Sequence, residues 1–324
     1  MLASPFVPGS RLLSVAGARP VGMFSADELA APFGKDAAWI EKRTGIRRLG
    51  RLGPAEDIVD LATSAGQLAL DRAHGAGLSD AVDLVVTASC STTADAARTV
   101  AARLAPHAAW FALNSACSGF GYALATVDGL IRTSSARVAL VVAMEHMSAL
   151  LDPTDLGTSI IFGDGAGAAV LAADEDAGHI APVVFGSDGA LSRLIAQDDA
   201  GRLRMQGRSV FRWAVDTVPG LIIEACRRAR VSLGEIALFV PHQANLRIID
   251  AVRRALDLDE SVVATDVTDA GNTSAASIPL AIDSALAADP ALHGKLALLT
   301  GFGAGLSYTA QVIRLPGANP AGGT

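Results

Sequence analysis

One cysteine in this sequence stands where a nucleophile could operate. Cys117 lies in NSACSGFGYAL, residues 114–124, among small residues and directly before an apolar run of helical period. The free N–H groups and the dipole at a helix N-terminus stabilise a thiolate, and small neighbours leave room for a substrate. Because free cysteines are also among the most buried residue types, a packed core thiol is the alternative. Cys90 and Cys226 lack this setting, and we expect Cys226 to be structural.

Two polar clusters in the second half of the chain are further candidates for chemistry. His242 lies in PHQAN, residues 241–245, where polar residues directly follow an apolar run. Asn272 lies in GNTSAAS, residues 271–277, and offers a side-chain donor among small neighbours. The alternatives are a structural histidine in the first cluster and a helix N-cap in the second, since Asn, Thr and Ser are favoured caps.

Two glycine runs resemble nucleotide-binding loops only superficially. FGDGAGAAV at 162–170 and GFGAG at 301–305 do not fit GxGxxG, and a strand rather than a helix is expected after each. We interpret them as tight turns where backbone meets backbone or a ligand. Paired-His, HExxH and Cys-cluster spacings are lacking from the sequence, so no metal site is expected.

The segment WIEKRTGIRR, residues 39–48, combines an aromatic ring with four cations. An exposed indole at Trp39 could stack on an adenine while the cations hold phosphates. The alternative is a solvated basic loop.

Apolar runs rich in strand-forming residues alternate with runs of helical period. We expect strands at 83–88, 137–144, 167–173, 236–241, 295–302 and 308–315. We expect helices at 57–74, 95–104, 118–134, 210–230, 245–256 and 275–288. Continuously apolar strands separated by helices indicate an α/β fold whose sheet is covered on both faces.

The order of these elements repeats, which indicates an internal duplication. We expect two halves, residues 1–173 and 174–324, that pack on each other without a linker. In this interpretation Cys117 and Asn272 occupy corresponding places, each at the start of a helix, and His242 follows a strand. Because sites of α/β sheets gather at the carboxyl ends of strands and at helix N-termini, the three residues could converge on one pocket.

Composition narrows the classes of protein that the chain can belong to. Of its 324 residues, 51% are hydrophobic and 18% charged, which favours a large core and some surface hidden in an oligomer. A net charge of -7 argues against a nucleic-acid partner. Three widely spaced cysteines without CxxC spacing fit a reducing compartment. Apolar stretches of membrane-spanning length and a signal-peptide pattern are not seen, so a cytoplasmic protein is expected, without a membrane partner.

Six motifs together resemble those of β-ketoacyl-acyl-carrier-protein synthase III, the initiating condensing enzymes of the thiolase-like superfamily. They keep the order of that family: WIxxRTGI at 39–46, ACSGF at 116–120, FGDGAG at 162–167, PHQANLR at 241–247, GNTSAASIP at 271–279 and GFGAG at 301–305. The resemblance implies an internally duplicated five-layer αβαβα fold and a homodimer.

The resemblance also implies a role for individual residues. Cys117 matches the acyl-accepting nucleophile, and His242 and Asn272 match the pair that promotes decarboxylation. The backbone N–H groups of Cys117 and Ala304 match the oxyanion hole. The positions that line a coenzyme A channel are matched by Trp39, Arg43, Asn245 and Arg247.

These roles imply acyl-CoA and malonyl-acyl carrier protein as substrates, the acyl carrier protein as partner, and no cofactor or metal. An acyl group loaded on Cys117 would be condensed with the enolate that malonyl leaves on losing CO₂, giving a 3-ketoacyl carrier protein that starts fatty-acid or polyketide synthesis. One alternative is an acyltransferase that passes the acyl group to an oxygen or nitrogen nucleophile without condensation. Another is a non-catalytic partner subunit, against which the intact Cys, His and Asn set argues.

Three departures from the family pattern bear on the substrate. In DLGT, Leu156 replaces an arginine that contacts coenzyme A in that family. Coenzyme A could therefore bind more weakly, or the acyl group could be delivered by a carrier protein instead. In STTAD, residues 91–95, Thr93 is the nearest match to a bulky residue at the end of the acyl pocket, which predicts room for longer or branched acyl groups. The stretch between residues 189 and 206 is short for that family, which predicts that one rim of the substrate channel is reduced.

Overall fold

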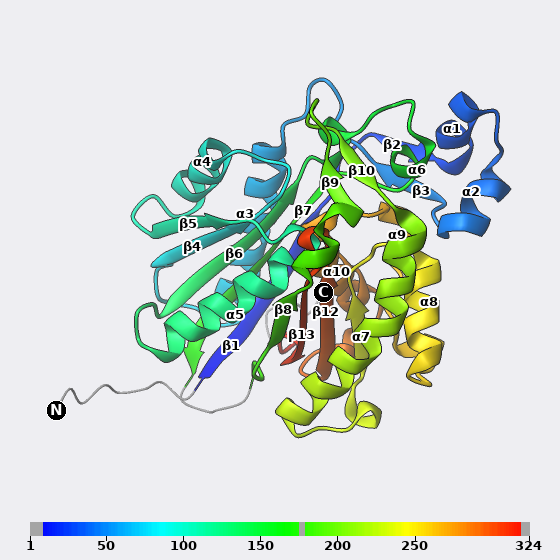
Figure 1. Cartoon of the computed structure of the whole chain (residues 1–324). Helices are drawn as coiled ribbons and strands as arrows, with labels where there is room; N and C mark the ends of the chain where they lie inside the picture. Colours follow the sequence, from blue (N-terminus) through cyan, green and yellow to red (C-terminus); the bar gives the residue numbers. More distant parts are fainter. Residues whose placement is uncertain (1–8, 175–178, 319–324) are drawn as a thin grey trace.

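The computed structural model describes residues 9–174 and 179–318, in which two large mixed sheets are flanked by helices (Figure 1) and two further sheets have two strands each. In spatial order, the first sheet consists of β1 (Gly9–Ala18), β7 (Gly165–Asp174), β6 (Val138–Glu145), β4 (Leu84–Ala88) and β5 (Ala109–Leu113). The second sheet consists of β8 (Val184–Ser187), β13 (Ser307–Arg314), β12 (Leu296–Phe302) and β11 (Leu238–Pro241).

The two sheets repeat the same strand order and the same strand directions. Strand β4 is parallel to β6, as β11 is to β12, and β7 and β13 are antiparallel to both of their neighbours. A parallel bridge between Phe239 and Val263 extends the second sheet beyond β11, where β5 stands in the first. The expected internal duplication of the fold is therefore confirmed.

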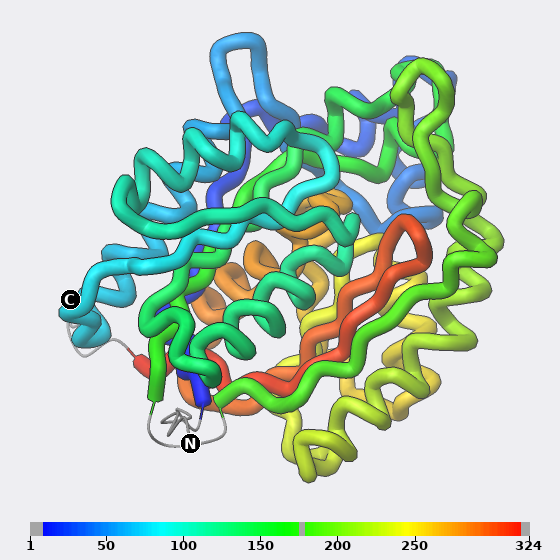
Figure 2. Tube along the Cα trace, turned by 60° about the vertical axis from the view of Figure 1, so that its left-hand side comes forward, coloured from blue at the N-terminus to red at the C-terminus, as the bar shows by residue number. Residues whose placement is uncertain are grey.

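Helices complete five layers. The outer face of the first sheet is covered by α3 (Ile58–Gly75) and α4 (Ala94–Leu104). The outer face of the second is covered by α7 (Gly207–Ala229) and α8 (Leu246–Ala255). Between the sheets lie α5 (Gly119–Arg132), blue-green in Figure 2, and α10 (Ser277–Ala288), orange in the same view; each contacts strands of both sheets. This is the expected αβαβα order.

Every strand and helix expected from the sequence is present, with small shifts at the ends. Strands β1, β5 and β8 were not expected. The residues of β5 are exposed or half-buried because the strand lies at the edge of the sheet. Its sequence therefore lacks the long apolar run by which the buried strands are predicted. The remaining regular elements are β2 (Met23–Ser25), α1 (Ala26–Ala30), α2 (Ala37–Thr44), β3 (Arg48–Gly50), α6 (Leu156–Ser159), β9 (Ile195–Gln197), β10 (Leu203–Met205) and α9 (Val267–Ala270).

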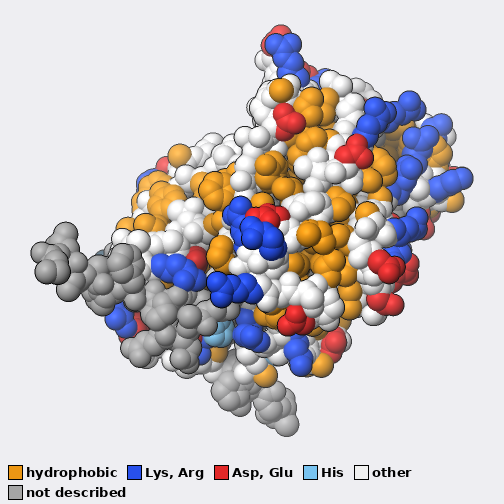
Figure 3. Space-filling model, turned by 60° about the horizontal axis from the view of Figure 1, so that its bottom comes forward, with side chains coloured by type: hydrophobic (Ala, Val, Ile, Leu, Met, Phe, Trp, Pro, Cys, Tyr) orange, Lys and Arg blue, Asp and Glu red, His pale blue; other side chains and the backbone are white. Residues whose placement is uncertain are grey.

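The division of the chain into residues 1–173 and 174–324 stays a prediction, although all strands of the first sheet precede those of the second. Strand β7 continues to Asp174, one residue beyond that boundary. On the face seen in Figure 3, hydrophobic side chains form extended areas between charged ones. Among the described residues, helices that are long enough to cross a membrane are too polar to do so, and the apolar ones are too short.

The central layer depends on a close approach between α5 and the second sheet. A Cβ added at Gly121 of α5 would lie 2.3 Å from the Thr309 hydroxyl oxygen and 2.9 Å from the Thr309 Cβ on β13. Glycine at this position therefore sets the distance between α5, which directly follows the turn that contains Cys117, and the second sheet.

We expect Gly121→Ala to lower the free energy of unfolding by about 1–3 kcal/mol, because the added methyl group overlaps Thr309. Gly129→Ala on the same helix is the matched control, since nothing lies within 4 Å of an added Cβ there. Its helix propensity should stabilise the protein by up to about 1 kcal/mol. Urea denaturation of both variants measures the difference, and a Gly121 variant as stable as the control would contradict the close packing.

Candidate active site

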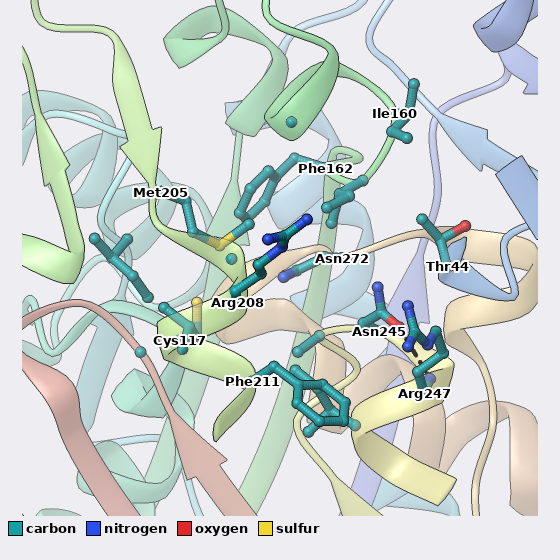
Figure 4. Close-up of a pocket in the computed structure, with 18 of the residues that line it drawn as sticks. Thr44, Cys117, Ile160, Phe162, Met205, Arg208, Phe211, Asn245, Arg247 and Asn272 are labelled. Carbon is teal, nitrogen blue, oxygen red and sulfur yellow. Dashed lines mark hydrogen bonds between the residues drawn. The ribbon is translucent and has the colours of Figure 1, made fainter. Parts of the chain in front are cut away.

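A cavity of about 1600 Å³ opens between the two sheets and helices α2, α6, α7 and α8. Cys117, His242 and Asn272 all line it, so the convergence expected from the sequence is present. His242 and Asn272 are buried, with 2% and 4% of their surface exposed. Figure 4 shows Cys117 on one side of the cavity and Asn245 with Arg247 on the other.

Cys117 lies in a single 3-10 turn, Ala116–Ser118, directly before α5. The turn is held by Ser118, whose hydroxyl donates to the Ser115 carbonyl oxygen at 2.6 Å. On the other side, the end of β12 meets the cysteine: a Cβ at Gly303 would lie 2.6 Å from the Cys117 nitrogen. Only a glycine lets the two backbones approach this closely.

The turn before α10 has the same construction as the turn before α5. The Asn114 side-chain oxygen accepts from Ala116 N at 3.1 Å, and the Asn272 side-chain oxygen accepts from Ser274 N at 2.9 Å. Ala116 and Ser274 then take the left-handed conformation, with φ of 47° and 48°. The counterpart of Asn272 is therefore Asn114, three residues before Cys117, and the expected positional match between Cys117 and Asn272 is wrong by one helical turn.

The expectation of a stabilised thiolate at Cys117 is also corrected. The pKa of Cys117 is raised from 9.0 to about 12, chiefly by burial; a hydrogen bond with the Ser274 side chain opposes the rise and the Glu145 carboxyl group adds to it. Withdrawal from water thus outweighs the favourable helix end, because an unpaired charge in a low-dielectric site is costly. This direction favours a neutral thiol over a thiolate at the half-buried Cys117.

His242 directly follows β11 and is fixed on two sides. Its backbone N–H donates to the Thr300 carbonyl oxygen at 2.6 Å, and its Nδ1 lies 2.8 Å from the Ser277 hydroxyl oxygen. The ring meets Phe302 edge-on, with centroids 5.3 Å apart. Burial lowers the pKa of His242 from 6.5 to about 3, so the imidazole is neutral at ordinary pH.

Asn272 is held by the FGDGAG segment of the first half. Its backbone N–H donates to the Ile161 carbonyl oxygen at 2.9 Å, and its carbonyl oxygen accepts from Gly163 N at 3.1 Å. A Cβ at Gly163 would lie 2.6 Å from the Ala270 carbonyl oxygen, so this approach requires glycine. The interpretation of both glycine runs as places of close backbone contact is confirmed here and at Gly303. With its side-chain oxygen bonded to Ser274 N, Asn272 directs its amide N–H groups elsewhere, toward the cavity that it lines.

The residues expected at a coenzyme A channel line the outer part of the same cavity. Trp39 is half-buried rather than exposed, and the Arg43 guanidinium lies 4.3 Å from its ring centroid. Asn245 caps α8 and donates its side-chain amide to the Arg43 carbonyl oxygen at 3.3 Å. The Arg247 guanidinium lies 5.8 Å from the ring centroid of Phe211.

The cations of the early loop divide into two groups. Arg47 and Arg48 pair with Asp269, at 2.5 and 3.1 Å, and do not line the cavity. Lys42 and Arg43 line it, and Leu156 lies among the lining residues where the family places an arginine. Sequence reasoning identified Arg247 as well, but it did not identify Lys35, Arg208 and Arg212 at the cavity. The full set, none of which forms an ion pair within residues 9–174 and 179–318, is Lys35, Lys42, Arg43, Arg208, Arg212 and Arg247.

Thr93 is not among the residues that line the cavity of its own chain, so the expectation for it fails within one chain. It is exposed, and its hydroxyl caps α4 by accepting from Ala96 N at 3.2 Å. The apolar part of the cavity is built instead by a cluster that the sequence did not reveal: Cys90, Met147, Phe162, Ile195, Leu203 and Met205. Three of these come from the β9–β10 hairpin, which occupies the short stretch between 189 and 206.

Comparison with known proteins places this architecture in a family. The family description "3-Oxoacyl-[acyl-carrier-protein (ACP)] synthase III" matches residues 111–189, and the description of its C-terminal part matches residues 226–315. Beta-ketoacyl-[acyl-carrier-protein] synthase III 4 of Streptomyces coelicolor is 41% identical and covers 95% of this chain and 99% of the relative. Beta-ketoacyl-[acyl-carrier-protein] synthase III of Mycobacteroides abscessus is 40% identical and covers 94% of each.

Solved structures support the same family assignment. The priming β-ketosynthase of the R1128 polyketide biosynthetic pathway superposes with a TM-score of 0.90 at 37% identity, over 98% of this chain and 99% of that one. The 3-oxoacyl-(acyl carrier protein) synthase III of Pseudomonas aeruginosa gives 0.88 at 37% identity, over 96% and 100%. The chain therefore belongs to the 3-oxoacyl-[acyl-carrier-protein] synthase III family of condensing acyltransferases.

Proposed function

We propose that this chain loads an acyl group from a thioester onto Cys117 and condenses it with malonyl-acyl carrier protein. The product is a 3-ketoacyl carrier protein that starts a fatty-acid or polyketide chain. The observation that carries the proposal is that a thiol, a neutral imidazole and a side-chain amide line one cavity whose wall also carries six cations. The names of the relatives support initiating condensation.

In the first step Cys117 attacks the acyl carbonyl carbon and the donor thiol leaves. The negative charge that develops on the carbonyl oxygen requires donors already in place. The backbone N–H groups of Cys117 and Ala304 are our candidates, and the close approach at Gly303, next to Ala304, supports their pairing.

In the second step the malonyl carboxylate leaves as CO₂, and its bonding electrons form an enolate. His242 and Asn272 would donate to the enolate oxygen. The Ser277 hydroxyl accepts from Gln243 N at 3.3 Å and is therefore free to donate to Nδ1 of His242, which leaves the proton on Nε2. The enolate carbon then attacks the Cys117 thioester, and the cysteine leaves as a thiolate.

The six cations that line the cavity, which form no ion pair among the described residues, suit phosphate groups, although the whole chain carries a net charge of -7. Trp39, Arg43, Asn245 and Arg247 would bind coenzyme A, with the Arg43 guanidinium and the Trp39 indole already stacked. Leu156 cannot contribute a charge there, whereas Arg208 can, because it lies inside the cavity (Figure 4). The same cations suit the phosphopantetheine of a carrier protein.

We also propose a homodimer in the cytoplasm. Within residues 9–174 and 179–318, strand β5 pairs with β4 on one side only, and its sequence AWFAL is apolar and largely exposed, with Trp110 40% exposed. An apolar open edge strand is a site for pairing with a second chain. The three cysteines are free thiols, which fits a reducing compartment.

The two proposed steps, acyl loading and condensation, can be distinguished by mass spectrometry. Incubation with acyl-CoA should add an acyl group to Cys117, visible by intact mass, and Cys117→Ala should abolish the adduct. Asn272→Ala should form the adduct normally yet lose most 3-ketoacyl product after malonyl-acyl carrier protein is added. Equal loss of both steps would contradict the division of roles. An adduct without product in the unmodified chain would favour acyl transfer to an oxygen or nitrogen nucleophile.

The acyl preference follows from the apolar cluster around the thiol. Because that cluster offers flexible Met147 and Met205 side chains and no charged group, isobutyryl-CoA and octanoyl-CoA should load at least as fast as acetyl-CoA. Leu203→Phe should slow octanoyl loading more than acetyl loading. A clear acetyl preference in the unmodified chain would overturn the prediction.

Burial of His242 has a consequence for stability. The folded-state pKa is depressed to about 3, whereas the unfolded imidazole takes up a proton below pH 6.5. Because the unfolded state then binds more protons, stability falls as pH drops below that value, by about 2 kcal/mol between pH 7.5 and 5.0. His242→Gln should remove this part of the pH dependence of stability. His107→Gln, at an exposed position, is the control and should keep it. Denaturation midpoints at several pH values test it, and identical slopes for both variants would refute it.

A further inference from the structure

Two buried hydroxyl groups meet behind the turn that carries the thiol. Ser118 has no exposed surface and Ser307 is 8% exposed, and neither side chain lines the cavity. Their hydroxyl oxygens lie 2.8 Å apart, although the two residues are 189 positions apart in the sequence. The proposed reaction gives these hydroxyls no part, so their contact calls for an explanation.

The Ser307 hydroxyl bridges two turns of the backbone. Its oxygen lies 3.1 Å from the Ser115 carbonyl oxygen, where the turn of Cys117 begins, and 3.1 Å from the Ala304 carbonyl oxygen. Since Ser118 donates its only proton to the Ser115 carbonyl oxygen at 2.6 Å, it can only accept from Ser307. The single Ser307 proton is therefore shared among three acceptors, two in the Cys117 turn and one at Ala304.

The turn that contains Ala304 is strained and depends on anchors of this kind. Gly305 and Leu306 both take the left-handed conformation, with φ of 75° and 41°, which is unfavourable for leucine. Residues persist in such a conformation where the surrounding structure fixes them. Gly303 N donates to the Ser307 carbonyl oxygen at 3.0 Å, and the Leu306 side chain is fully buried. The Ser307 hydroxyl adds a side-chain hydrogen bond from this turn to the one before α5.

Acyl loading makes a demand on the geometry between these two turns. As Cys117 Sγ bonds to the acyl carbon, the electron pair of the carbonyl group moves onto its oxygen. The pair returns when the bond to the donor sulfur breaks, and the Cys117 proton ends on the departing thiol. The proposed donors to that oxygen, the backbone N–H groups of Cys117 and Ala304, belong to separate segments. Each is effective only when it is held at about 2.7–3.1 Å from the oxygen.

We propose that Ser307 is a positioning residue for acyl transfer: its hydroxyl keeps the backbone N–H of Ala304 aligned with that of Cys117, so that both donate to the acyl oxygen. This inference rests on the proposed function. Because the Cys117 thioester presents the same carbonyl group during condensation, Ser307 supports both steps. Asn272 differs in this respect, since its loss is expected to spare loading.

The test is single-turnover loading with octanoyl-CoA, followed by intact mass, in the unmodified chain and in Ser307→Ala. We expect the maximal loading rate to fall about 30-fold, less than the roughly 100- to 1000-fold that follows outright loss of an oxyanion donor. The octanoyl-CoA concentration that gives half of the maximal rate should stay the same, because Ser307 does not line the cavity.

Alkylation of Cys117 by iodoacetamide distinguishes positioning of the donors from a general disturbance of the thiol. The sulfur attacks a CH₂ group and iodide leaves, so no oxyanion forms. Ser307→Ala should therefore be alkylated at Cys117 as fast as the unmodified chain, as measured by peptide mass.

Ser14→Ala is the matched control, because it removes a buried hydroxyl that donates to the Ala69 carbonyl oxygen at 2.6 Å and does not line the cavity. It should lower thermal stability and load at the unmodified rate.

If Ser307→Ala does not fold, Ser307→Thr and Ser307→Val supply a pair of equal size, of which only the first keeps a hydroxyl. Both β-branched side chains suit the extended backbone at this position, where φ is -68° and ψ is 146°. Ser307→Thr should load about 10-fold faster than Ser307→Val, which corresponds to one hydrogen bond.

Absence of an adduct in the unmodified chain would overturn the proposed function itself. Undiminished loading by Ser307→Ala, or equal loading by Ser307→Thr and Ser307→Val, would overturn the positioning role alone. Equal slowing of alkylation and loading would do the same, because the defect would then lie in the thiol. Slower loading with normal alkylation and an unchanged half-saturating concentration supports the proposal.

Discussion

The close contact between two helix-opening turns, buried between two sheets, is the constraint on which the rest of this structure depends. The turns before α5 and α10 share one design, an Asn side chain bonded two residues ahead and a strained left-handed residue after it. Glycines at 163 and 303 let backbone from elsewhere in the fold seal both turns. Duplication of one half thus produces two equivalent turns that pack against each other. The site between them is asymmetric because the two turns carry different side chains.

Removal of water from this contact determines the chemistry. Burial raises the pKa of Cys117 and lowers that of His242, so both side chains favour their uncharged forms at rest. Uncharged donors stabilise an enolate without protonating its carbon, which suits condensation.

Toward the mouth of the cavity the lining side chains are mostly charged, in contrast to the uncharged Cys117 and His242 deeper inside. Six cations and one carboxylate, Asp216, line the cavity of a protein whose net charge is -7, and within the part of the chain that the structure describes the six form no ion pair, so the local charge differs in sign from that of the whole molecule. A mouth of this kind attracts phosphates while the inner cavity accepts an apolar acyl chain. Leu156 brings no charge to the cavity, whereas Arg208 of α7 lines the same cavity.

The sequence by itself determined the layered fold and the meeting of Cys117, His242 and Asn272, because apolar periodicity, repeat order and motif spacing are local properties of the chain. Only the tertiary structure decided which groups are buried and what they touch. It raised the pKa of a thiol that a helix end was expected to ionise, paired Arg47 away from the cavity and left Thr93 outside it. These outcomes depend on desolvation and on contacts between residues far apart in sequence, and no local pattern records either.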